Sequence, residues 1–255
     1  MMRYLKLSFL ILLILIFTLS CEKVEKIVNK EKKPTKTVAV LIDLSGSTKN
    51  FRKDAFRTFK KILSSIDHGD VIVVAKITES SISEPEIPIE EAFPEFVPRD
   101  NAGNPTDNPF LVKKAKKEAD KELAEKKKRI LKKLEGFLFS VNAVRTDIMS
   151  SLHVASRIFS NYPRDKAILV IISDMIENSG AYNFDRMRLT EKRIEEIINT
   201  EKAKNRMPEL YGVKVYVVCG GNVTTRKYFN VQQFWMRYFK ECGAELSEKN
   251  YGSTL

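Results

Sequence analysis

The chain has 255 residues, of which 43% are hydrophobic and 30% are charged, with 10 glycines and 9 prolines. This composition excludes a collagen-like chain, a chain made only of coiled coil and a wholly disordered chain. Three cysteines are too few for a disulfide-rich scaffold. About 200 residues outside the terminal segments are enough for one domain with a substantial core.

The first 20 residues are typical of a secretory signal peptide. Arg3 and Lys6 precede an almost unbroken apolar stretch at 7–19, and the small residue Ser20 follows it. The stretch is shorter than the ~20 apolar residues of a membrane span. The remaining chain has 42 basic and 33 acidic residues, a net charge of +9. We therefore expect an exported protein.

Cys21 follows this stretch, where a bacterial lipoprotein signal places its acylated cysteine. The residues before it loosely resemble the lipobox, since Ser20 fits the pattern and Thr18 departs from it. Residues 21–36 are polar and lysine-rich, as a tether between a lipid anchor and a folded domain would be. We expect an exported bacterial lipoprotein, anchored on the periplasmic face of a membrane or at the cell surface. A plain cleaved signal and an uncleaved anchor are the alternatives.

Apolar, β-branched runs alternate with amphipathic segments in the rest of the chain. The runs predict buried strands at 37–43, 71–77, 167–173 and 213–218. Apolar residues at helical spacing predict helices at 49–66, 111–139, 147–160, about 184–200 and 229–241. Strands that alternate with helices predict a doubly wound α/β domain with a mostly parallel sheet at 37–242 and a tail at 243–255.

Residues 79–139 interrupt this alternation. The part at 79–110 holds six of the nine prolines and eight acidic residues against one basic residue. At most an edge strand at 87–93 is expected there. The following helix would be ~44 Å long, against ~20 Å for a typical strand, so its N-terminal half must project beyond the sheet or have its own partner. The acidic loop is a candidate for that partner.

The long helix is strongly basic, with eleven Lys or Arg against four acidic residues at 113–133. Three interpretations stay open: a solvated helix face, a surface for acidic lipid headgroups, and a face that contacts the acidic loop. Nucleic acid is not expected as a partner of an exported protein.

Oxygen-bearing side chains follow two of the predicted strands. Asp43, Ser45 and Ser47 come directly after the first strand, Asp174 ends the third strand in chain order, and Thr146 precedes a helix. Ligands of doubly wound sheets bind at the carboxyl ends of the strands. A small, lightly charged set of carboxylates and hydroxyls suits Mg²⁺ or Mn²⁺ better than Ca²⁺.

This set resembles the metal-ion-dependent adhesion site of the von Willebrand factor type A (VWA) domain family. The resemblance rests on Asp43-x-Ser45-x-Ser47, the distant Thr146 and the Asp174 that follows a buried strand. It implies that the three hydroxyls bind one divalent cation directly and that the two carboxylates hold metal-bound waters. It also implies a protein partner that presents an acidic residue to the metal.

The resemblance covers about residues 36–242, with two departures. Arg145 stands where the family often has Gly before the Thr, and Met175 where it often has Gly after the last Asp. We expect a partner-binding rim around the metal formed by Arg145, Met175, Glu177, Gly220 and Asn222.

A simpler interpretation is that these residues only cap structural elements. Ser45 and Ser47 would then cap the helix at 49–66, and Asp147 and Asp174 would cap a helix and a strand end. That accounts for each residue singly, but less easily for all of them at one edge of the sheet.

The sequence thus predicts a membrane-tethered protein that binds another protein through a divalent cation, with no small-molecule substrate and no enzyme activity. The alternative is a metal-independent structural or assembly lipoprotein that uses 79–139 as its docking surface. A hydrolase with a metal-bound water between Asp43 and Asp174 is a third hypothesis. Against it, there is no nucleophile elbow, and neither histidine is expected near the site.

Overall fold

The computed structural model describes residues 33–252 apart from 80, 140–144 and 220–224. Residues 35–255 form one compact unit, which is the part considered below. The predicted signal peptide, Cys21 and most of the predicted tether lie outside the described residues. Within the described ranges, no helix combines the length and the apolar character that a membrane span requires.

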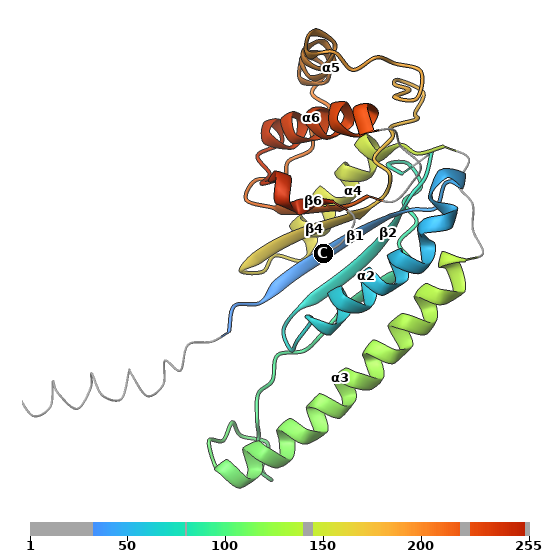
Figure 1. Cartoon of the computed structure of the whole chain (residues 1–255). Coiled ribbons are helices and arrows are strands. Elements are labelled where there is room, and N and C mark those ends of the chain that lie inside the picture. The colour runs from blue at the N-terminus through green and yellow to red at the C-terminus, as the bar shows by residue number, and fades with distance from the viewer. Residues whose placement is uncertain (1–32, 80, 140–144, 220–224, 253–255) are drawn as a thin grey trace, which may run out of the picture. The chain divides into compact units, whose positions relative to one another are not determined.

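A six-stranded sheet forms the centre of the unit, in the order β3–β2–β1–β4–β5–β6 (Figure 1). The strands are β1 (Lys36–Asp43), β2 (Val71–Ile77), β3 (Ile89–Ala92), β4 (Lys166–Ile172), β5 (Lys214–Val218) and β6 (Tyr251–Gly252). Only β3 is antiparallel to its neighbour. This confirms the predicted α/β fold, with a mostly parallel, VWA- or Rossmann-like sheet. The winding reverses between β1 and β4, because β1 pairs with β2 on one side and with β4 on the other.

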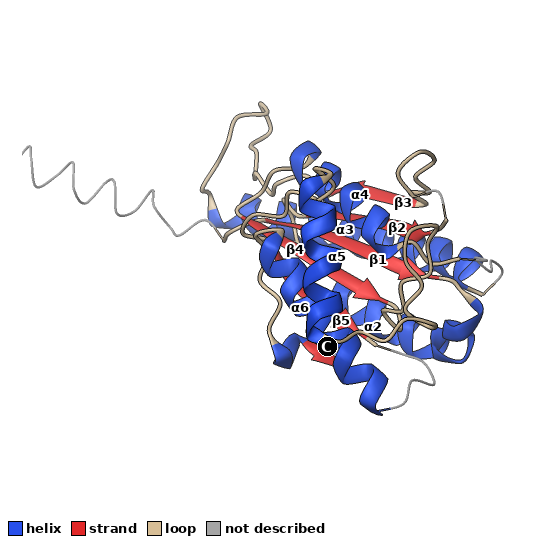
Figure 2. Ribbon diagram, turned by 90° about the horizontal axis from the view of Figure 1, so that it is seen from above, coloured by secondary structure: helices blue, strands red, loops and turns tan. Residues whose placement is uncertain are grey.

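Helices cover both faces of the sheet (Figures 1 and 2). One face carries α2 (Arg52–Ser64) and α3 (Pro109–Leu138). The other carries α4 (Ile148–Asn161), α5 (Glu191–Ala203) and α6 (Thr225–Glu241). Two short 3-10 helices, η1 (Gly46–Phe51) and η2 (Glu248–Asn250), complete the described elements.

The core is divided between the two faces by the alternation of side chains along each strand. In β1, Val38, Val40 and Ile42 pack with α2 and α3. Ala39 and Leu41 point to the opposite side and pack with α4 and α6. Because both faces are covered, the strands are apolar on both sides, which is why they appear in the sequence as continuous apolar runs.

Two predicted boundaries differ from the structure. The helix expected from about residue 184 begins at Glu191, after Thr190, whose hydroxyl accepts a hydrogen bond from the Arg193 N–H at 3.3 Å. The apolar residues that suggested an earlier start include Phe184, which is buried in the preceding loop. The tail expected after residue 242 contributes β6, whose Tyr251 is only 5% exposed.

Candidate metal centre

Two carboxylates flank the point where the winding of the sheet reverses. Asp43 is the last residue of β1, and Asp174 lies two residues beyond the end of β4. The two strands are in register here, with Ile42 paired to Ile172. Both carboxylates are buried, with exposed fractions of 3% for Asp43 and 8% for Asp174. This is the position at which doubly wound sheets bind ligands.

Asp43 is held by hydrogen bonds from both strand ends. Its Oδ1 accepts from the Ser45 N–H at 2.8 Å, and its Oδ2 accepts from the Ser173 hydroxyl at 2.7 Å. The Ser173 oxygen in turn accepts from the Met175 N–H at 2.9 Å. The fully buried Ser173 therefore joins the end of β1 to the loop after β4. Sequence reasoning assigned it no role, although a serine at the end of an apolar strand was a visible signal.

Replacement of Ser173 by Ala is expected to lower the free energy of unfolding by about 1–3 kcal/mol, because Asp43 and Met175 each lose a buried hydrogen-bond partner. Urea denaturation measures the change. Ser160→Ala is the control, since this exposed hydroxyl donates only to the Ser156 carbonyl, and its effect should stay within about 0.5 kcal/mol. Equal losses in the two variants would contradict the role of Ser173.

The two serine hydroxyls of the loop belong to the same network. The Oγ atoms of Ser45 and Ser47 are 3.0 Å apart. Burial raises the pKa of Asp174, and the nearby Ser47 hydroxyl offsets part of that rise. Ser45 occupies the N-cap position of η1, but its side chain makes no capping hydrogen bond. Helix capping therefore does not explain either serine, and both hydroxyls lie beside the carboxylates.

Thr146 is tied to the loop after β4 through its main chain. Its N–H donates to the Asn178 carbonyl at 3.2 Å, and the Asn178 N–H donates back at 2.8 Å. Thr146 is buried, with 5% of the residue exposed. The next residue, Asp147, caps α4 as predicted, by accepting from the Ser150 N–H at 2.9 Å. The structure thus joins Asp43, Ser45 and Ser47 by direct hydrogen bonds and pairs the backbone of Thr146 with the loop that follows Asp174.

The electrostatics of the two carboxylates favour a bound cation. Burial raises the pKa of Asp43, and burial together with the charge of Asp43 raises the pKa of Asp174 to about 6. The buried Arg52, whose Nη2 donates to the Leu44 carbonyl at 3.0 Å, lowers the pKa of Asp43 only in part. Two adjacent buried carboxylates with hydroxyl neighbours are a suitable donor set for a hard divalent cation.

The predicted rim is wrong for two of its members. Met175 and Glu177 are both fully buried, so neither can face a partner. Arg145 is exposed, as a rim residue should be. Gly220 and Asn222 lie outside the described residues. Proximity in sequence to Asp174 was a poor guide, because the loop folds inward directly after that residue.

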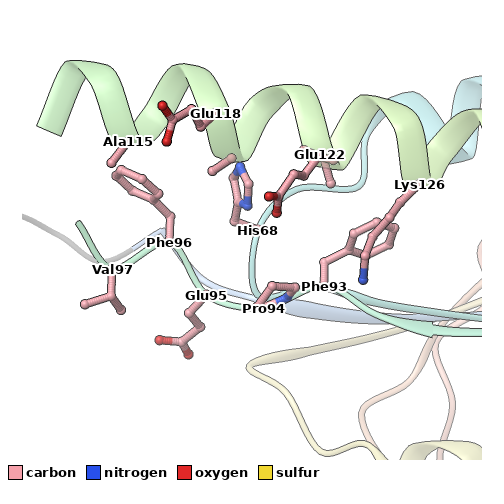
Figure 3. A pocket seen from close by; sticks show the side chains of 12 residues that line it. His68, Phe93, Pro94, Glu95, Phe96, Val97, Ala115, Glu118, Glu122 and Lys126 are labelled. Carbon is pink, nitrogen blue, oxygen red and sulfur yellow. The ribbon is translucent and has the colours of Figure 1, made fainter. Parts of the chain in front are cut away.

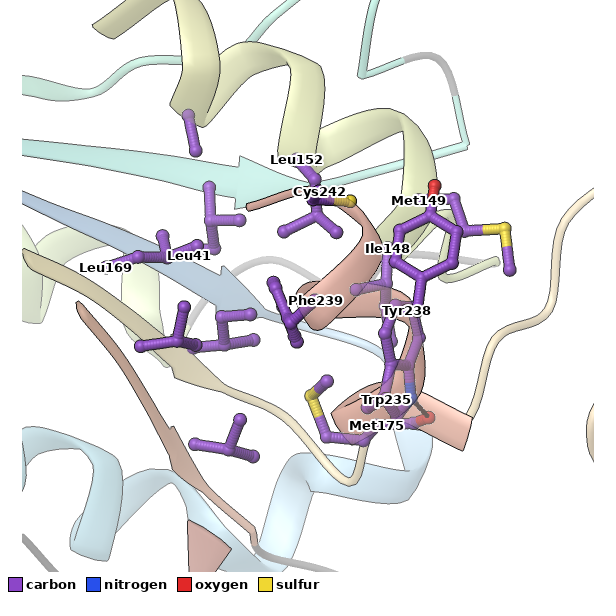
Figure 4. Packing of buried hydrophobic residues seen from close by; sticks show 14 of the residues in the cluster. Leu41, Ile148, Met149, Leu152, Leu169, Met175, Trp235, Tyr238, Phe239 and Cys242 are labelled. Atoms are coloured by element: carbon purple, nitrogen blue, oxygen red, sulfur yellow. Dashed lines mark hydrogen bonds between the residues drawn. The ribbon is translucent and has the colours of Figure 1, made fainter. Parts of the chain in front are cut away.

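Met175 explains the inward turn. Its φ of 63° is in the left-handed region that Gly adopts without cost, the residue that the VWA family often has here. The side chain packs into the core, and the carbonyl accepts a hydrogen bond from Trp235 Nε1 at 2.9 Å (Figure 4). The loop that carries Asp174 is therefore anchored on α6.

Glu177 caps the N-terminus of α4. Its Oε2 accepts from the N–H groups of Ile148 at 2.9 Å and Met149 at 3.2 Å. Burial, with a contribution from the charge of Asp147, raises its pKa to about 8. Glu177 thus supports the start of the helix that follows Thr146.

No protein-family model matches the sequence, and no curated protein matches it. Among solved structures, a mutant of the PilB minor pilin from Streptococcus sanguinis has a TM-score of 0.52 at 12% identity, over 88% of this chain and 58% of the pilin chain. An aerotolerance-related membrane protein from Bacteroides fragilis has a TM-score of 0.40 at 12% identity, over 84% and 92% of the two chains. A von Willebrand factor type A protein from Catenulispora acidiphila has a TM-score of 0.36 at 13% identity, over 84% and 44%. At 12% identity, the similarity to the pilin chain shows a shared fold and nothing more.

Proposed function

We propose that this chain is a protein-binding module whose contact site includes one Mg²⁺ or Mn²⁺ ion. The observation that carries the proposal is the pair of buried carboxylates, Asp43 and Asp174, at the point where the winding reverses, with raised pKa values and serine hydroxyls between them. A cation removes the repulsion between these carboxylates. Ser45, Ser47 and Thr146 would hold it through hydroxyls, and the two carboxylates through waters.

The partner would complete the coordination with a carboxylate of its own. Neutral hydroxyls in the first shell leave the cation with excess positive charge, which attracts an incoming acidic side chain. The exposed Arg145, next to Thr146, adds positive charge at the same edge. The similar fold of a minor pilin is compatible with a binding role. Export and lipid anchoring through Cys21 belong to the same proposal.

We propose a binding function rather than catalysis, because the residues of the site that the structure describes include no general base besides its two carboxylates. Both histidines make contacts elsewhere: His68 Nε2 lies 3.1 Å from Asp120, and His153 Nε2 lies 3.1 Å from the Arg206 carbonyl. A metal-independent assembly role that docks on 79–139 is the second candidate, since α3 in this segment carries many exposed lysines. Partner binding that is insensitive to EDTA would favour it.

Thermal unfolding of residues 35–255 with Mg²⁺ or Mn²⁺ and with EDTA tests the metal site. A cation at 100 times its Kd stabilises by ~2.7 kcal/mol, which corresponds to a rise in Tm of roughly 5–11 °C for a domain of this size. The chain has one tryptophan, and its indole is bonded to the carbonyl that follows Asp174. Its fluorescence should therefore follow the same titration.

Two variants make the result specific. Asp174→Asn should abolish both the rise in Tm and the change in fluorescence, because it removes a charge from the site. Asp185→Asn is the control, since this exposed carboxylate also raises the pKa of Asp174 but pairs with Lys227 outside the site. A rise in Tm that survives in Asp174→Asn, or no rise in the wild type at 10 mM cation, would sink the metal proposal.

A further inference from the structure

The positive charge of the folded unit is concentrated on one face of the sheet. Residues 35–255 hold 37 basic and 30 acidic residues, a net charge of +7. The neighbouring helices α2 and α3 alone hold 16 basic and six acidic residues, a net charge of +10. The rest of the unit therefore has a net charge of −3. A face this basic on an otherwise slightly acidic protein suits a negatively charged partner.

The inner side of α3 packs against α2 and the sheet. Ile130, Leu134 and Leu138 are buried against the sheet and α2. Lys126 Nζ lies 2.6 Å from Glu91 at the edge of the sheet. The predicted contact between the acidic segment and the basic helix therefore exists, but on this side only.

The inner side of the N-terminal half of α3 faces His68 and the segment at 93–97 (Figure 3). A hollow of about 260 Å³ separates it from the segment at 93–97, and is lined by Phe93, Phe96 and His68 among others. His68 is mostly enclosed here, with a side chain that is 13% exposed and paired with Asp120. The N-terminal half of α3 thus has a contact on its inner side, through His68 and Asp120, and its outer side remains open to solvent.

That outer side carries a straight row of lysines with a phenylalanine at each end. Spacings of three, four and seven residues place the row on one face of the helix. We call it the outer stripe of α3; its members are Phe110, Lys114, Lys117, Lys121, Lys128, Lys132 and Phe139. The exposed Glu125 and Glu135 lie on the same face, so the five lysines and two glutamates give it a net charge of +3. All are exposed, with exposed fractions of 76% for Phe110 and 48% for Phe139. Within the described part of the chain, Lys128 alone of these lysines has an ion pair, with Glu125 at 2.8 Å.

We propose that the outer stripe of α3 docks flat on an anionic membrane surface. Lysine ammonium groups are point charges that suit a diffuse layer of lipid phosphates, whereas bidentate recognition of a single acidic group favours Arg. The exposed ring of Phe110 would enter the interface, as aromatic residues do in amphipathic interfacial helices. Phe139, just beyond the C-terminal end of α3, is half-exposed and its ring centroid lies 6.4 Å from that of Phe56 on α2. The ~44 Å length of the stripe fits an extended surface better than a compact protein epitope.

Co-sedimentation with vesicles tests this docking without any lipid anchor. Residues 35–255 form a compact unit that contains both halves of the core, so this fragment can be used alone. It should bind vesicles of phosphatidylcholine with 30% phosphatidylglycerol, should not bind phosphatidylcholine alone, and should dissociate as the salt concentration rises. Each lysine near an anionic surface contributes about fivefold to the affinity.

The variant with Lys114, Lys121 and Lys132 all changed to Glu should therefore bind at least about 100-fold more weakly. The control variant has the exposed Lys192, Lys204 and Lys240 changed to Glu. It alters the net charge by the same amount, but on the opposite side of the sheet.

This control should retain most of the binding. Phe110→Ser should weaken binding several-fold without changing Tm, because the ring is exposed. Equal loss in both triple variants, or no binding of the wild type at 50 mM salt, would overturn the proposal. Binding to soluble poly-glutamate without binding to vesicles would also overturn it, in favour of an acidic protein partner.

Discussion

Replacement of Glu177 by Gln is expected to raise the free energy of unfolding at pH 8 and to change it little at pH 5. Burial raises the pKa of Glu177 from its usual value near 4.5 to about 8. Between these pH values the folded state holds a proton on Glu177 that the unfolded state has lost. The wild-type free energy of unfolding therefore falls as the pH rises through this window. The loss amounts to roughly 3–5 kcal/mol at pH 8.

Gln cannot ionise, so the variant lacks this loss. Its amide oxygen can still accept from the N–H groups of Ile148 and Met149, but its NH₂ group would replace an oxygen that has no hydrogen-bond partner among the described residues. An unsatisfied buried donor costs about 1–3 kcal/mol. The protonated wild type carries its proton on the same oxygen at pH 5, so the two proteins should differ little there, whereas the variant should be more stable at pH 8.

Urea denaturation at several pH values measures the difference between the two proteins. Asp43 and Asp174 also have raised pKa values, but they are present in both proteins and cancel in the comparison. Parallel pH profiles for wild type and variant would show that Glu177 stays ionised in the folded protein.

Truncation of Trp235 to Ala is expected to lower the free energy of unfolding by about 3–5 kcal/mol. The side chain is fully buried and contacts the rings of Phe184, Phe234 and Tyr238. Figure 4 shows it beside Tyr238. The change also leaves the buried Met175 carbonyl without the indole N–H. Urea denaturation followed by circular dichroism measures the loss, since the only tryptophan is removed.

Two further variants separate packing from the hydrogen bond. Trp235→Phe keeps most of the ring and should cost about 1–2 kcal/mol, and it should weaken cation binding, because the Asp174 loop loses its anchor on α6. Phe229→Ala removes a ring that is 54% exposed and should change stability by less than about 0.5 kcal/mol. A comparable loss in Phe229→Ala would contradict this account.

Much of the fold could be predicted because the strands are buried on both faces. The run at 71–77 matches β2 at both ends, and the run at 37–43 differs from β1 by one residue. Parallel strands between two helical layers have no polar alternation, so they appear as continuous apolar runs. The strand β6, with two residues, has no such pattern and forms only because β5 provides an edge to pair with.

The acidic and hydroxyl residues of the candidate site could also be proposed from the sequence, because strand ends of a parallel sheet meet at one edge. Asp43, Ser45, Ser47 and Asp174 do meet there. The supporting contacts could not be predicted in the same way. Ser173 bonds to a residue 130 positions away, and Glu177 caps a helix 28 and 29 positions before it.

The sequence by itself determined the class of fold, the end of the sheet where the site lies and the excess of lysine on the long helix. Each of these depends on local composition and periodicity, which need no knowledge of distant contacts. Only the tertiary structure decided which side chains face solvent. Met175 and Glu177 turn inward because the loop after Asp174 is anchored on Trp235, whereas the outer stripe of α3 stays exposed because its acidic neighbours contact the other side of the helix.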